Sequence, residues 1–153
     1  FLLQKMPVLK AAGIRRINVS LDTLHPVMFQ KICRSGDLPT VLAGIDALLD
    51  AGIKVKINMV PMRTQNEDQI VPLLNYCLAR GIELRFIELM RMGHWQHNAD
   101  YSRELVPMGR ILSLIAQRYT YLGTAAEFDA TAARFEIPGN GFFGIIANES
   151  LPF

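Results

Sequence analysis

Three stretches of the chain share one design, in which apolar and polar positions alternate soon after a glycine. They are residues 16–21, 53–60 and 82–90, and they follow Gly13, Gly52 and Gly81. Such alternation is typical of β-strands, whereas the residues before each glycine have the apolar spacing of a helix that ends there. The pattern predicts a run of parallel β-α units, and in such folds ligand sites collect at the carboxyl ends of the strands.

Helical spacing is also found on either side of these strands. It predicts helices over residues 2–12, in a short segment after Thr23, over 41–50, and from Glu67 to Gly81. Pro39-Thr40 is expected to start the third helix, and Asn66 is expected to cap the fourth through its side-chain oxygen. With these helices the fold class is α/β.

The last third of the chain has a different pattern. We expect one amphipathic helix here, capped by Ser102 and continuing to Ile115. Residues 134–138 and 142–146 flank Gly139-Asn-Gly141 and predict a β-hairpin. Residues 139–144 also spell GxGxxG, but a strand-like run follows them where a dinucleotide site needs a helix. The hairpin is therefore the favoured interpretation.

The second strand places Lys54, Lys56 and Asn58 on one face, and the first places Asn18 and Ser20 similarly. A parallel sheet that is covered by helices should be apolar on both faces. A polar face therefore predicts a solvated cavity, in which Lys56 and Arg85 meet phosphate or carboxylate oxygens. The alternative is an edge strand whose polar face lies in water.

Composition excludes several classes of protein. The chain has 153 residues, half of them hydrophobic, which predicts one domain with a substantial core. A net charge of +2 argues against a nucleic-acid or membrane-surface partner. No apolar run approaches the roughly 20 residues that span a bilayer, and no export signal is present. With two separated cysteines, these features predict a cytoplasmic protein.

Other candidate chemistry is weak. His94 and His97, with Asp100 nearby, have neither the spacing of a helical pair nor a complete zinc set, so we expect exposed loop histidines. Cys33 and Cys77 have no neighbouring base and are interpreted as structural thiols.

The chain begins inside a predicted helix, and three parallel strands cannot close a barrel, which takes about eight. We therefore interpret it as an internal piece of a larger protein. Its exposed sheet edges make a homodimer possible.

Five segments together resemble the GTP 3′,8-cyclase family of molybdenum cofactor biosynthesis, which are radical S-adenosylmethionine (SAM) lyases. They are residues 15–24, 51–58, 66–74 and 82–93, and the closing hairpin over 134–146. The resemblance implies an incomplete TIM-like barrel of parallel β-α units. Residues 1–93 would form its central units, and residues 94–153 a C-terminal helix and hairpin that lead to a second cluster motif.

In that family the cofactors are SAM and two 4Fe–4S clusters, and the substrate is GTP. By resemblance, Ser20 and Met90 correspond to positions that contact SAM, and Lys56 and Arg85 to positions that bind GTP. The polar pattern of the three strands had already indicated a ligand site at the same carboxyl ends, independently of this resemblance.

The chain departs from the family in its cysteines. The family's N-terminal CxxxCxxC is absent, and so are its C-terminal cluster cysteines. We therefore expect no catalytic residue and no metal ligand within this chain, which by itself would retain no cofactor and be inactive. Two alternatives stay open, a radical SAM paralogue with another substrate and a non-catalytic nucleotide-binding module.

Overall fold

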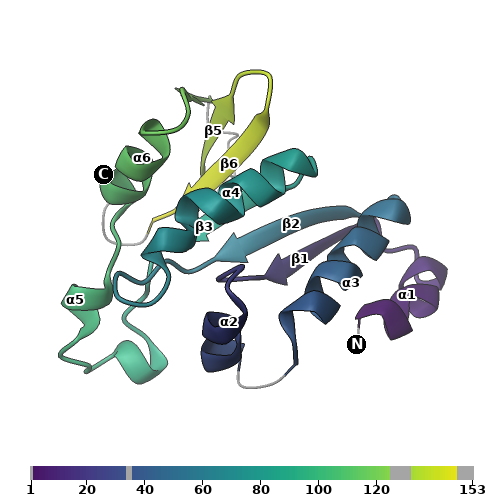
Figure 1. Cartoon of the computed structure of the whole chain (residues 1–153), viewed down its shortest axis with the longest axis horizontal. Coiled ribbons are helices and arrows are strands. Elements are labelled where there is room, and N and C mark those ends of the chain that lie inside the picture. Colours follow the sequence, from purple (N-terminus) through teal and green to yellow (C-terminus); the bar gives the residue numbers. More distant parts are fainter. Residues whose placement is uncertain (1, 34–35, 125–131, 148–153) are drawn as a thin grey trace.

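The predicted strands lie in one six-stranded sheet, with the order β1-β2-β3-β6-β5-β4 (Figure 1). The computed structural model describes residues 2–33, 36–124 and 132–147. Strands β1, β2, β3 and β6 pair parallel to one another. Strand β5 pairs antiparallel with β6 on one side and with β4 on the other. Their bounds are β1 (Arg16–Ser20), β2 (Lys54–Met59), β3 (Glu83–Ile87), β4 (Leu122–Gly123), β5 (Ala133–Ile137) and β6 (Gly141–Ile146). The sheet is open, as the predicted partial barrel requires.

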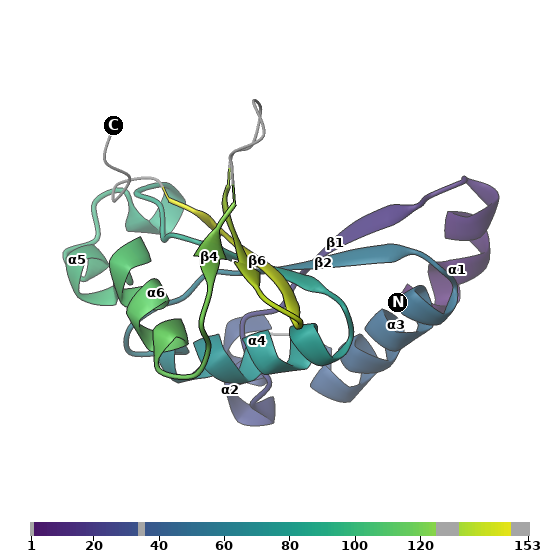
Figure 2. The same cartoon turned by 90° about the horizontal axis from the view of Figure 1, so that it is seen from above.

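Helices connect the parallel strands and lie on one side of them. Figure 2 shows α2, α3 and α4 together below the sheet. The helices are α1 (Leu2–Ala11), α2 (Pro26–Cys33), α3 (Leu38–Asp50), α4 (Ile70–Ala79), α5 (Tyr101–Glu104) and α6 (Met108–Ala116), with short 3₁₀ helices η1 (Glu67–Gln69) and η2 (Gly93–Trp95). Among the described residues, no helix has both the length and the apolar character needed to cross a bilayer.

The core fills the space between the sheet and these helices. Alternate strand residues such as Ile57, Met59 and Phe86 are completely buried there against helix residues such as Leu48 and Leu73. Each side chain of this size contributes roughly 1.5–3 kcal/mol when it is fully buried. Because neighbouring strand residues point to opposite faces, the residues between them must face away from the helices.

The helix expected from Ser102 to Ile115 is wrong, because the structure has two helices there. Helix α5 ends at Glu104, and α6 begins at Met108 after an extended Pro107. Proline has no N–H for the helical ladder and disfavours helical geometry in the residue before it. Leu105 instead forms an isolated antiparallel bridge with Met62.

Two predicted helix starts are also corrected. Helix α3 begins at Leu38, before the predicted residue 41, because the Asp37 side chain accepts a hydrogen bond from the Thr40 N–H. Asn66 does not cap the helix that follows it. Its side chain turns inward instead, and the segment opens with the 3₁₀ turn η1 before α4 begins.

The hairpin prediction is confirmed, and its position in the sheet is a further finding. Strands β5 and β6 pair antiparallel around the turn at residues 138–140, where Gly139 has a φ of 77°. That region of φ favours glycine. Strand β6 also pairs parallel with β3, which brings the hairpin into the same sheet as the β-α units. The division of the chain at residue 93 stays a prediction.

Candidate functional site

A basic cavity lies on the face of the sheet that points away from the helices. It has a volume of about 360 Å³ and is lined by Arg16, Asn18, Lys56 and Arg85. These residues alternate along β1, β2 and β3 with the core residues, so strand geometry alone directs them to this face. The predicted cavity is therefore present, and it contains both basic residues that the sequence singled out.

Strand register arranges the polar residues of this face in two rows. One row runs from Ser20 through Asn58, Arg85 and Gly144 to Arg134. The next row runs through Asn18, Lys56 and Glu83. Lys56 and Arg85 thus lie on adjacent strands in adjacent rows, close enough to act on one ligand.

Hydrogen bonds hold the basic side chains of this face in place. Arg85 Nε donates to Asn58 Oδ1 at 3.0 Å. Glu83 accepts from Lys56 Nζ at 3.2 Å through one carboxylate oxygen and from an Arg134 NH2 group at 3.2 Å through the other. Lys56 and Arg134 remain 44% and 43% exposed, whereas Glu83 is only 15% exposed. The two cations therefore keep donors available to a ligand.

The balance of charge on this face is positive. Strand parity places five cations of the described strands on this face, Arg16, Lys54, Lys56, Arg85 and Arg134, against two carboxylates, Glu83 and Glu136. Glu83 is bonded to two of the cations, Lys56 and Arg134. A concave surface lined by like charges concentrates ligands of the opposite sign. Guanidinium and ammonium groups at such a surface form charge-assisted hydrogen bonds with phosphate and carboxylate. The arrangement suits a polyanionic ligand.

Ser20 and Met90 lie nearer the carboxyl ends of the strands than the basic cavity does. Ser20 is the exposed last residue of β1, and Met90 follows β3 and is half-buried. Tyr101, which is buried, donates a hydrogen bond from its hydroxyl to the carbonyl of Leu89 at 2.8 Å. This bond fixes the chain immediately before Met90. Lys56 and Arg85 both line the cavity. Ser20 and Met90 do not line it and lie outside it.

A buried amide joins the loops that leave β1 and β2. Asn66 Oδ1 accepts from the Met62 N–H at 2.7 Å, and Nδ2 donates to the carbonyls of Asp22 at 2.8 Å and Val60 at 3.2 Å. Asp22 Oδ1 in turn accepts from the Val60 N–H at 2.8 Å. Burial raises the pKa of Asp22, although the Val60 hydrogen bond opposes that rise. These bonds fix the carboxyl edge of the sheet, where ligands of such folds bind.

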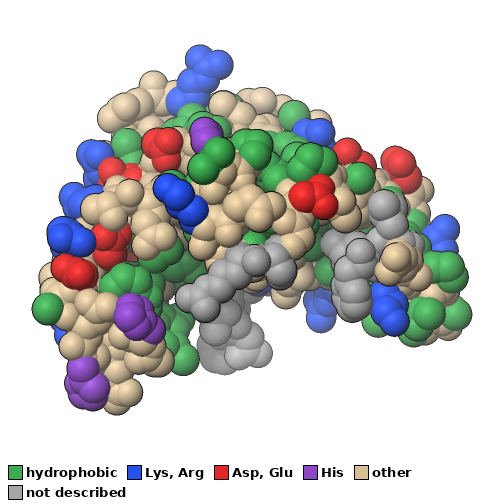
Figure 3. Space-filling view, turned by 60° about the horizontal axis from the view of Figure 1, so that its bottom comes forward, with side chains coloured by type: hydrophobic (Ala, Val, Ile, Leu, Met, Phe, Trp, Pro, Cys, Tyr) green, Lys and Arg blue, Asp and Glu red, His purple; other side chains and the backbone are tan. Residues whose placement is uncertain are grey.

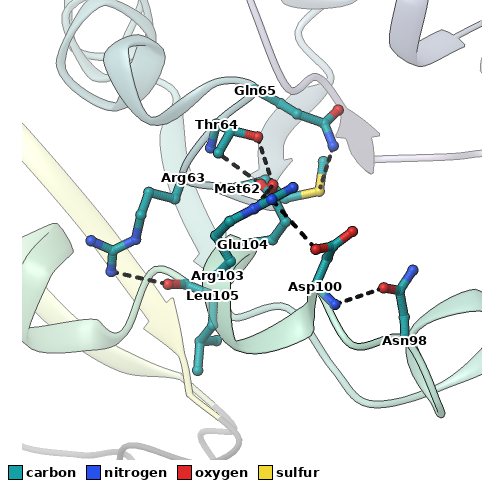
Figure 4. Close-up of polar contacts among 9 residues, drawn as sticks. All are labelled: Met62, Arg63, Thr64, Gln65, Asn98, Asp100, Arg103, Glu104 and Leu105. Atoms are coloured by element: carbon teal, nitrogen blue, oxygen red, sulfur yellow. Dashed lines mark hydrogen bonds and ion pairs between the residues drawn. The ribbon is translucent and has the colours of Figure 1, made fainter.

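A second set of bonds ties the β2 loop to α5 (Figure 4). The buried carboxylate of Glu104 accepts from the N–H of Thr64 at 3.1 Å and from its hydroxyl at 2.6 Å. The Arg63 side chain donates to the carbonyl of Leu105 at 3.3 Å. Helix α5, although short, therefore braces the loop beyond β2.

Cysteine and histidine chemistry does not form a site among the described residues. Cys77 is buried in α4, and burial raises the pKa of its thiol to about 12. Cys33 is exposed, and its thiol pKa is also raised. His94 and His97 are exposed, as predicted, and His94 contacts Trp95 and Asn98. Figure 3 shows histidine side chains at separate places on one face of the molecule, and the Lys and Arg side chains on that face are also dispersed. Within the described ranges no three potential metal ligands come together.

Sequence reasoning missed Arg16, Glu83 and Arg134 on the cavity face. Arg16 and Glu83 could have been found, because they share strand parity with Ser20 and Arg85. Arg134 carried no such signal. It reaches this face only because the hairpin joins the edge of β3.

Comparison with known proteins agrees with this geometry. Residues 2–77 match the radical SAM superfamily. This part of the chain belongs to that superfamily. Three relatives named GTP 3′,8-cyclase match most of the chain, from Sulfurovum sp. (37% identity over 90% of this chain and 41% of the relative), Hydrogenovibrio crunogenus (39%, over 95% and 45%) and Helicobacter pylori (38%, over 100% and 47%). The chain thus spans less than half the length of these relatives.

Membership of the radical SAM superfamily implies SAM and an iron–sulfur cluster in the whole protein. The cysteines of this chain do not fit a cluster. There are two, Cys33 and Cys77, and the second is a buried thiol with a pKa of about 12, whereas iron binds thiolates. The polar face of the sheet can instead contribute ligand contacts.

Proposed function

We propose that this chain forms the substrate-binding wall of a GTP 3′,8-cyclase, the enzyme of the first step of molybdopterin biosynthesis. Lys56 and Arg85 bind the phosphates of GTP, and Ser20 and Met90 contact SAM. The observation that carries the proposal is the basic cavity of about 360 Å³ at which Lys56 and Arg85 meet. A peptide substrate would not require this concentration of positive charge, whereas a triphosphate does.

The residues of this chain bind and orient the substrate. Lys56 offers a flexible ammonium group, and Arg85 offers a planar fork that Asn58 holds in position. Phosphate oxygens bonded to both would fix the nucleotide at the polar face and direct its remainder to the carboxyl edge, where Ser20 ends β1. SAM and two 4Fe–4S clusters, held by cysteines other than those of this chain, supply the one-electron chemistry. The chain alone is inactive. A cytoplasmic location and a homodimer stay predictions.

Binding of GTP to the Lys56→Ala and Arg85→Ala variants of the complete protein tests the proposal. Each substitution is expected to weaken binding by roughly 1–3 kcal/mol, because each removes a charge-assisted hydrogen bond. Isothermal titration calorimetry measures the dissociation constants, and guanosine provides a ligand without phosphate. Arg118→Ala is the matched control, since Arg118 is exposed beyond the end of α6.

The two alternatives predict different results. A paralogue with another substrate would prefer a different nucleotide or anion over GTP, with the same dependence on Lys56 and Arg85. A non-catalytic binding module would bind GTP without converting it in the complete protein supplied with SAM and reconstituted clusters. If both alanine variants bind GTP as tightly as the unchanged protein, the phosphate assignment is wrong.

A further inference from the structure

Arg134 extends from the antiparallel hairpin towards the basic cavity. It lies on β5, two strands away from Arg85, and its guanidinium carbon is 3.9 Å from the centroid of the Phe142 ring on β6. One NH2 group of the same guanidinium donates to Glu83 on β3 at 3.2 Å. The side chain therefore crosses β6, stacked on an aromatic ring that fixes its direction.

Glu83 brings Arg134 next to a residue that lines the cavity. Its carboxylate is shared between Lys56 and Arg134, each at 3.2 Å. A guanidinium has five N–H donors and an ammonium has three. The bond to Glu83 uses one donor of each group, and both side chains remain more than two-fifths exposed. Arg134 is therefore held in place and still able to bind an anion.

The position between Arg134 and Arg85 carries no side chain. Gly144 is paired with both residues, with Arg85 on β3 and with Arg134 on β5. A Cβ atom at this position would lie 3.4 Å from Arg85 Cγ and 3.6 Å from the Cβ of Ala132. Gly144 is buried, and the Arg85 stem and Ala132 pack over it. A longer side chain would press on the Arg85 stem, so glycine lets Arg85 lie against β6.

We propose that Arg134 is a further substrate-binding residue, which contacts the phosphate chain of the nucleotide from the hairpin side of the cavity. The proposal rests on the proposed function and specifies the extent of its phosphate subsite. The backbones of Arg85 and Arg134 are separated by roughly 10 Å, but the Arg134 guanidinium crosses β6 and bonds to the carboxylate that also binds Lys56 Nζ. Arg134 thus adds a cation to the phosphate subsite beside Lys56.

The test is the affinity of the complete protein for GTP, GMP and guanosine with Arg134→Gln. The substitution is expected to weaken GTP binding about tenfold, the effect of one charge-assisted hydrogen bond, to weaken binding of GMP, which has one phosphate, to a smaller extent, and to change guanosine binding less than twofold. Arg134→Lys retains the positive charge but not the planar guanidinium. Its GTP affinity should therefore lie between that of the unchanged protein and that of Arg134→Gln. Arg118→Gln removes the same charge from an exposed site beyond α6 and should leave all three affinities unchanged.

Each result either supports or overturns the inference. If Arg134→Gln binds GTP within twofold of the unchanged protein while Lys56→Ala and Arg85→Ala bind it weakly, Arg134 is not a ligand and only this inference fails. Equal losses for GTP, GMP and guanosine would also overturn it, because they indicate a structural role. If none of the three variants loses affinity for GTP, the proposed function fails as well.

Discussion

Replacing Asn66 with alanine should destabilise the protein strongly although the residue touches no ligand. The side chain is completely buried and makes three hydrogen bonds to backbone groups of two loops. Its removal leaves the Met62 N–H and the carbonyls of Asp22 and Val60 without these partners. An unsatisfied buried polar group costs about 1–3 kcal/mol, and carbonyls in loops can recover part of that from water. We therefore expect a loss of roughly 3 kcal/mol in the free energy of unfolding.

Urea unfolding followed by circular dichroism measures this loss directly. The control is Gln117→Ala, which removes an exposed amide just beyond α6 and should change stability by less than about 0.5 kcal/mol. An Asn66→Ala protein whose unfolding free energy matches that of the control would refute the reasoning. It would show that the loops after β1 and β2 do not depend on this amide.

Two further predictions concern titratable groups. At pH 8 a thiol reagent should modify exposed Cys33 in the native protein but Cys77 only after unfolding, because burial raises the pKa of the Cys77 thiol to about 12. Rapid modification of both thiols in the native protein would contradict this. Burial also raises the pKa of Asp22, so its stabilising contribution is present below the unfolded pKa and is lost as pH rises through the folded pKa. Asp22→Asn should therefore gain stability relative to the unchanged protein as pH rises from 3 to 7, and a constant difference in melting temperature would count against the assignment.

Periodicity predicted the parallel strands and most helices correctly because it reports burial. The alternation in β2 separates Ile57 and Met59, which are buried against helices, from Lys56 and Asn58, which face the cavity. Since side chains in a strand alternate strictly between two faces, the polar positions of one strand are enough to indicate a solvated face. The same local rule predicted the closing hairpin from its turn residues.

Predictions from local sequence failed where a side chain or backbone group forms its hydrogen bonds with a segment that is distant in the sequence. Asn66 has the composition and position of a helix cap, yet its amide bonds to the backbone of Asp22, 44 residues earlier in the chain. Pro107 could have been recognised as a break between α5 and α6, because proline lacks the N–H that the helix needs. The bridge between Met62 and Leu105 that accompanies the break depends on a contact far away in the sequence.

The residue order alone therefore specifies the β-α units, the polar face and the pair Lys56 and Arg85, since each depends on spacing within a strand or on neighbouring strands. The full phosphate-side surface depends on long-range pairing. Arg134 joins it because β6 adds to the edge of β3, and its guanidinium lies over the Phe142 ring of β6 and reaches Glu83. Local sequence patterns do not predict which edge of the sheet the hairpin pairs with. This part of the site is therefore defined only by the assembled sheet.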